Sequence, residues 1–90
     1  MKPAFYILYS ERIDKYYTGS CVNLNSRLKD HNNGNSTYTS LGTPWILKYY
    51  EFYSNLKEAR ERERKIKKMK SRKFIEMLIS KFNPDETLLM

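Results

Sequence analysis

Runs of apolar residues separated by polar segments predict three β-strands. The first two runs, 5–9 and 16–20, are short and rich in aromatic and β-branched residues. The polar segment between them is typical of a β-hairpin turn, so we expect these strands to pair antiparallel. The third run, 45–53, is apolar on both faces. This pattern predicts the central strand of a sheet.

Apolar residues three and four positions apart predict three helices. The first begins at Asn23 or Asn25 and runs to about Asn33, and the third begins after Ser71. The second follows Asn55, which precedes a glutamate by three residues as in a capping box. The inward-facing residues of the three helices are Leu24 and Leu28; Leu56, Ala59, Ile66 and Met69; and Phe74, Ile75, Leu78, Ile79 and Phe82.

The order ββαβαα predicts an α+β fold, with a small three-stranded antiparallel sheet flanked by about three helices. A chain of 90 residues is short enough for one hydrophobic core, so we expect a single domain over residues 1–82. Asn83-Pro84 ends the last helix. Residues 83–90 are predicted to form a C-terminal tail.

Charge is concentrated in one segment. Residues 57–73 hold ten Lys or Arg and three Glu, which equals the formal net charge of +7 for the whole chain. A basic helix favours a polyanionic partner, either a nucleic acid or a membrane surface. The single Cys21 excludes an internal disulfide, and we find no signal peptide and no apolar stretch long enough for a membrane span. These features predict a cytoplasmic protein.

Glu63 interrupts the apolar side of the second helix. The inward positions there are 56, 59, 63 and 66, so a carboxylate occupies a position that suits an apolar residue. An inward carboxylate is costly unless it is paired or binds a metal. Pairing with neighbouring basic residues of the same helix is the alternative to a functional role.

Two further pairs could carry chemistry. Arg27 and His31 are four residues apart and share one face of the first helix. Tyr6 and Tyr17 lie on the first two strands, where both hydroxyls could point to that face. The cations could lower a tyrosine pKa enough for general-base catalysis. A polar helix edge and ordinary aromatic packing are the alternatives.

The motifs in order resemble the GIY-YIG nuclease superfamily. They are Phe5-Tyr6-Ile7, Tyr17-Thr18-Gly19, Arg27-Leu28-Lys29-Asp30-His31, and Glu58-Ala59 with Glu63 before Lys65-Ile66-Lys67. The chain is most similar to small stand-alone members related to the N-terminal domain of an excinuclease ABC component. The resemblance implies phosphodiester hydrolysis with one divalent metal, Mg²⁺ or Mn²⁺. It also implies that Tyr6, Tyr17, Arg27 and Glu63 are catalytic, with Glu63 binding the metal, and that His31 lies where some members place a histidine.

We therefore expect a metal-dependent DNA endonuclease that acts in DNA repair or on structured DNA. Tyr6, relayed by His31, is the favoured base and Tyr17 the positioning group, although the opposite order is open. Repair proteins that supply targeting are a further expected partner, and the oligomeric state is open. The residues expected to contact nucleic acid are Arg27, Arg60, Arg64, Lys67 and Lys68.

Two other functions compete with this prediction. The first motif has Ala4 where the family has glycine, and the family's accessory DNA-binding domain has no counterpart in this sequence. Both departures favour a catalytically inactive nucleic-acid-binding module that uses the basic helix. An amphipathic helix at a membrane surface or on a partner protein is the third possibility, and the narrow apolar face of 57–70 argues against it.

Overall fold

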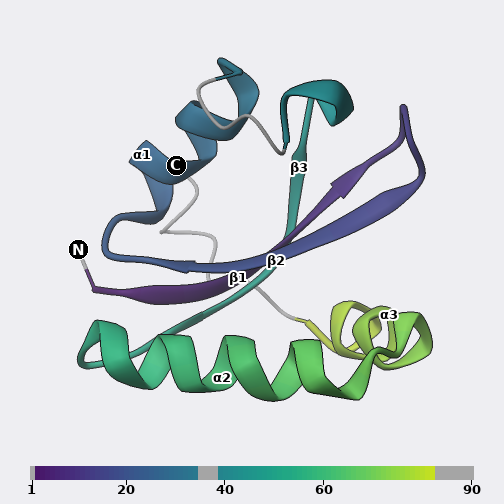
Figure 1. The fold of residues 1–90 in the computed structure, drawn as a ribbon. Helices are drawn as coiled ribbons and strands as arrows, with labels where there is room; N and C mark the ends of the chain where they lie inside the picture. The colour runs from purple at the N-terminus through teal and green to yellow at the C-terminus, as the bar shows by residue number, and fades with distance from the viewer. Residues whose placement is uncertain (1, 35–38, 83–90) are drawn as a thin grey trace.

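The computed structural model describes residues 2–34 and 39–82 and contains one antiparallel sheet (Figure 1). Its strands are β1, Ala4–Ser10, β2, Lys15–Cys21, and β3, Ile46–Phe52. They lie in the order β2-β1-β3, so β2 and β3 form the two edges.

The prediction that the third strand is central is wrong, because β1 occupies that place. Nearly every side chain of β1 is buried, as expected for a strand covered on both faces and paired on both edges. By contrast, Lys48 and Glu51 on β3 are only half-buried. Tyr49 and Glu51 suit an edge strand, since the Tyr49 ring packs against the core while its hydroxyl donates to the Glu51 carboxylate.

Three helices and one short turn of 3₁₀ helix complete the fold. They are α1, Leu24–Asn32, the 3₁₀ turn, Ser40–Gly42, α2, Leu56–Met69, and α3, Arg72–Ser80. Each α-helix begins after a polar residue whose side chain accepts a hydrogen bond from a backbone N–H of the first turn. These capping residues are Asn23, Asn55 and Ser71.

Helices cover both faces of the sheet, with α1 on one side and α2 and α3 on the other (Figure 1). Successive residues of β1 alternate between these faces. Tyr6 and Leu8 belong to the cluster on the α1 side, whereas Phe5 and Ile7 pack with Ile66 of α2. The sheet is therefore a thin layer that separates two small cores.

Most predicted inward positions of the helices are confirmed. Ala59 and Ile66 are buried, and the four apolar residues predicted on α3 pack against the sheet. Met69 is an exception, because half of its surface is exposed. Phe82 lies just beyond α3, where its ring contacts Tyr49 and Tyr50.

The fold class is as predicted, an α+β domain with the element order ββαβαα. Cys21 is buried as a free cysteine. None of the described helices is long and apolar enough to cross a membrane. The predicted stop at Asn83-Pro84 lies outside the described residues.

Candidate active site

Tyr6 lies across the neighbouring strand at Gly19. The two residues are partners in the β1–β2 register, and Tyr6 is only 1% exposed. A Cβ atom at position 19 would lie 2.6 Å from the Tyr6 hydroxyl oxygen and 2.7 Å from Cζ. Any side chain there would collide with the ring, so glycine is required for this close approach.

A buried chain of polar groups extends from Tyr6 into α1. The Tyr6 hydroxyl is 2.9 Å from Nε2 of His31, and Nδ1 of His31 is 2.8 Å from Oγ1 of Thr39. Burial, reinforced by the nearby charge of Arg27, lowers the pKa of His31 to about 4. His31 is therefore neutral at pH 7, with both ring nitrogens in hydrogen bonds that fix its orientation.

Burial also raises the pKa of Tyr6 above its ordinary value, and the opposing interaction with Arg27 does not compensate. The expectation that Arg27 and His31 lower a tyrosine pKa therefore does not hold at Tyr6. The reason is that a neutral imidazole supplies no positive charge, while desolvation disfavours a tyrosinate.

Tyr17 and Arg27 lie at the outer side of this buried group. The ring of Tyr17 is 4.9 Å from that of His31 and 6.3 Å from that of Tyr6, between centroids. Interactions with the hydroxyls of Tyr6 and Tyr17 raise the pKa of Arg27. The Arg27 side chain keeps 38% of its surface exposed and lies 3.9 Å from Asp30. Four of the five predicted catalytic residues thus come together on the α1 side of the sheet.

Glu63 is on the opposite face of the sheet, where α2 crosses β2. Its carboxylate accepts a hydrogen bond from the hydroxyl of Ser20 at 2.6 Å and pairs with Lys67 at 2.5 Å. Its side chain is 21% exposed. With Arg60 and Arg64 these residues line a hollow of about 240 Å³. The inward position of Glu63 predicted from the helix pattern is therefore confirmed.

The two groups of residues approach each other at β2, whose outer edge is not paired with another strand among the described residues. Lys67 lines the hollow of Glu63 and also a neighbouring one of about 320 Å³ that contains Tyr17 and Thr18. Lys68 lines another hollow with Glu61 and Lys65, which adjoins the hollow of Glu63 at Arg64 but contains neither Glu63 nor Lys67. Among the predicted nucleic-acid contacts, Arg60, Arg64 and Lys67 line the hollow of Glu63. Arg27 lies across β2 from it, and Lys68 lines the adjoining hollow.

A second half-buried carboxylate, Glu51, has a different environment. It accepts hydrogen bonds from the hydroxyls of Tyr49 and Tyr53, and Arg62 donates two more at 3.1 and 3.2 Å. Burial alone would raise its pKa, but these donors outweigh burial and lower it. Its lone pairs are occupied, so Glu51 joins β3 to α2 and has little capacity left for a metal. Glu63 retains that capacity.

Two residues of the site were not predicted. Ser20 follows Gly19, so strand alternation alone places it on the face opposite Tyr6, and that signal was available. Thr39 lies in a polar segment without periodicity, and its contact with His31 depends on how the loop folds back. No residue pattern in the sequence could have identified it.

The class of protein is defined by three features together. They are the sheet, the paired tyrosines with Arg27, and the inward glutamate of α2. Residues 2–87 match the GIY-YIG catalytic domain, and the chain belongs to this family of nucleases. It is 39% identical over 74 residues to a UPF0213 protein of Clostridium perfringens, covering 81% of this chain and 80% of that protein. It is also 35% identical over 83 residues to a UPF0213 protein of Syntrophus aciditrophicus, covering 89% and 93%. No solved structure matches significantly.

Proposed function

We propose that this protein is a metal-dependent endonuclease that hydrolyses DNA phosphodiester bonds, acting on structured or damaged duplex in DNA repair. The observation that carries the proposal is the half-buried carboxylate of Glu63 in a basic hollow, across an edge strand from Tyr17 and Arg27. Hydrolysis of a phosphodiester needs groups that neutralise the phosphate charge, a base that accepts a proton from the attacking water, and a group that polarises the phosphate. This arrangement supplies all three.

Arg27 would bind the scissile phosphate, since a half-exposed guanidinium can grip two phosphate oxygens. We assign the role of proton acceptor to Tyr17 rather than to Tyr6. Tyr17 is half-buried and lines a hollow, whereas Tyr6 is buried and burial raises its pKa. Tyr6 and His31 would then act as positioning residues that hold Tyr17 and Arg27.

Nucleases of this family generally use a divalent metal, and the residues present fit one with a water-rich shell. Glu63 and Ser20 offer hard oxygen donors in the same hollow. Within residues 2–34 and 39–82, no group of three His, Cys, Asp or Glu could enclose an ion. A single carboxylate suits Mg²⁺ or Mn²⁺, which keep several waters. When bound, the ion would stabilise negative charge on the phosphate.

The proposal is tested by cleavage of linear, flap, splayed, four-way and single-stranded DNA, with RNA for comparison, in Mg²⁺, Mn²⁺ or EDTA. We expect metal-dependent cutting by the wild type, none by Glu63→Gln, and nearly unchanged cutting by Glu61→Gln. Glu61 is a matched control, because it is an exposed glutamate of the same helix outside the hollow. Equal cutting by wild type and Glu63→Gln would contradict the proposal.

A nucleic-acid-binding module without catalysis is the second candidate. The observation that favours it is the Lys67–Glu63 ion pair, which is what an ordinary basic helix would contain. It predicts salt-dependent binding that Glu63→Gln leaves intact, with no cutting in any metal. The membrane-surface alternative is disfavoured, since Ala59 and Ile66 of α2 are already buried in the protein. The single domain over 1–82, the tail over 83–90 and the cytoplasmic location stay predictions.

A further inference from the structure

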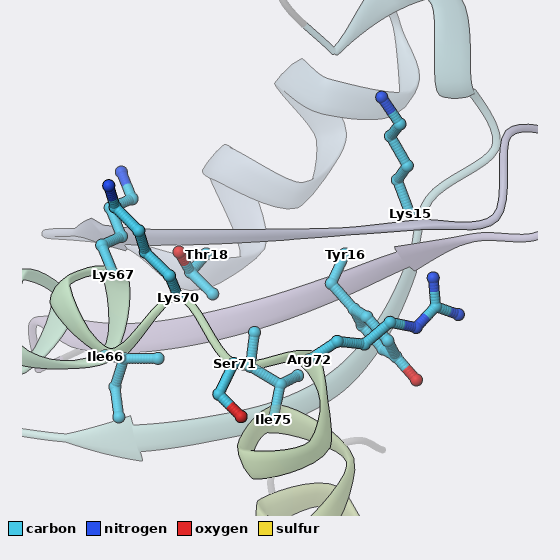
Figure 2. Close-up of a pocket in the computed structure, with 9 residues that line it drawn as sticks. All are labelled: Lys15, Tyr16, Thr18, Ile66, Lys67, Lys70, Ser71, Arg72 and Ile75. Carbon is cyan, nitrogen blue, oxygen red and sulfur yellow. The ribbon is translucent and has the colours of Figure 1, made fainter.

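A third hollow lies along β2 and reaches the turn between α2 and α3 (Figure 2). We call this hollow, the hollow of Glu63 and the neighbouring one that contains Tyr17 the cleft. It measures about 280 Å³, and its rim includes Lys15, Lys67 and Lys70. Lys67 lines all three hollows, and Tyr16 and Thr18 line two of them. The hollows therefore follow one another along one strand, starting from Glu63.

The cations of this third hollow differ in whether they are already paired. Arg72 binds Asp14 at 2.7 Å and Glu76 at 3.5 Å, and its guanidinium lies 5.1 Å from the ring centre of Tyr16. The positive charge of Arg72 is thus already paired with carboxylates of the same chain. Within residues 2–34 and 39–82, Lys70 makes no ion pair, so its charge is available to a ligand. In Figure 2, Lys70 extends from the end of α2 beside Lys67.

The backbone of Lys70 gives an independent indication of function. Lys70 ends α2 with φ 48° and ψ 40°, the left-handed conformation that glycine adopts most easily. A lysine at such a position is strained relative to glycine. Strained residues of this kind cluster at functional sites as well as at helix ends, and the side chain of Lys70 lines the hollow.

We infer that the hollow at the α2–α3 turn binds a backbone phosphate of the nucleic-acid strand whose scissile phosphate lies near Glu63. Lys70 is the main cation, because the side chain of Lys15 extends away from the hollow (Figure 2). Lys70 is seven residues beyond Glu63, or about 10 Å along a helix that rises about 1.5 Å per residue. A bound strand would therefore meet the second site a short distance along its backbone from the scissile phosphate. This inference rests on the proposed function. It adds the direction in which the bound nucleic-acid strand runs from Glu63.

The test separates the charge of Lys70 from its backbone conformation. Lys70→Gly and Lys70→Asn remove the charge, and both residues tolerate the left-handed conformation, while Lys70→Arg keeps the charge. Lys65→Gln is the matched control, because Lys65 is an exposed lysine of α2 outside the cleft. Binding of labelled duplex DNA is measured in EDTA over a salt series, with cleavage and thermal unfolding in parallel.

We expect Lys70→Gly and Lys70→Asn to weaken binding about fivefold and to reduce the salt slope by about 0.9, the value for one phosphate. Lys70→Arg should bind like the wild type, and Lys65→Gln should change binding less than Lys70→Asn. Lys70→Gly should also raise the melting temperature by about 4–8 °C, because it relieves strain of about 1 kcal/mol. Function and stability would then move in opposite directions at one residue.

The two proposals fail in different ways. If wild type cuts DNA but Lys70→Asn keeps the wild-type affinity and salt slope, the phosphate site is overturned and the nuclease stands. If the slope falls as expected but no metal supports cutting, the phosphate site stands without the nuclease. If the wild type binds no DNA, or if Lys65→Gln matches Lys70→Asn, the site is overturned.

Discussion

The two faces of β2 hold the two halves of the proposed site in different environments. On the α1 side, Tyr6, His31 and Thr39 are buried, and hydrogen bonds join them in a chain. On the α2 side, Glu63 and Lys67 are charged and in contact with water. We call the buried α1 side the dry side. In the proposed mechanism, the dry side holds groups in place, and the solvent-exposed α2 side binds a cation and phosphates.

Burial and the proposed catalysis make opposite demands on ionisable side chains. A tyrosine with a rigid neighbour and no water is well positioned but hard to ionise. A carboxylate at the surface ionises easily but needs a partner to hold it. We therefore expect substitutions on the dry side to affect mainly stability, and substitutions at the open groups to affect mainly cleavage.

The largest effect is expected at Arg27, which connects the buried chain to solvent. Arg27→Ala should lower the cleavage rate about 100- to 1,000-fold, as when a group that stabilises transition-state charge is removed. The folding stability of Arg27→Ala should change little, because the Arg27 side chain is 38% exposed. Cleavage assays beside thermal unfolding check this, with Arg27→Lys as the comparison that keeps the charge. Cleavage by Arg27→Ala at the wild-type rate would rule out the phosphate-binding role.

The dry side should make folding sensitive to acid through His31. Its pKa is about 4 in the folded protein against 6.5 in the unfolded chain. Because the unfolded chain binds this proton more tightly, stability present above pH 6.5 is lost as the pH falls toward 4. The loss is about 3 kcal/mol. Urea unfolding at pH 7 and pH 4 measures it, and His31→Gln should show a smaller difference. Equal differences in the two proteins would contradict the buried neutral histidine.

Gly19 and Ser20 are adjacent residues on opposite faces of β2. Substitutions at these two positions compare how much each face contributes to the folding free energy. Gly19→Ala forces a Cβ against the ring of Tyr6 and should cost about 1–3 kcal/mol of folding free energy, the range for overpacking. Ser20→Ala removes only a part-buried hydroxyl on the other face and should cost about 1 kcal/mol. Urea unfolding of both variants checks this. The close approach at Gly19 would be disproved if alanine there were the milder change.

The smallest effect is expected at Lys67, whose ammonium pairs with Glu63 and would compete with the proposed metal. An exposed ion pair is worth about 0.2–1 kcal/mol, so Lys67→Gln should lower the metal concentration for half-maximal cleavage about two- to fivefold. A metal titration measures this, with Lys68→Gln as the control outside the hollow. A higher metal requirement would show that Lys67 and the metal do not compete.

The strands, helices and capping residues could be predicted from local sequence, since Asn23, Asn55 and Ser71 each signal a helix start by their own chemistry. The order of strands could not. Both β1 and the segment 45–53 contain mostly apolar or aromatic residues, and sequence does not say which of two such strands has neighbours on both edges. The tyrosines obscure this, because they suit a buried strand and a half-exposed one equally well.

The site was predictable where a residue breaks a pattern and unpredictable where it depends on distance in space. Glu63 stands out because it interrupts an apolar stripe. The pKa direction of Tyr6 could not be predicted, because burial is a property of the packed fold rather than of neighbouring residues. Lys70 is one lysine among many in the sequence, and only its backbone conformation distinguishes it.

The placement of all the excess charge within 57–73 has a consequence for how the protein approaches its partner. The remaining residues are balanced, and α2 lies along one flank of the molecule (Figure 1). The protein therefore carries a large electric dipole whose positive end is the flank beside Glu63. A polyanion would turn the diffusing protein before contact, so that encounters begin with this flank forward. Orientation during approach is thus encoded by α2 together with the turn that follows it and the start of α3.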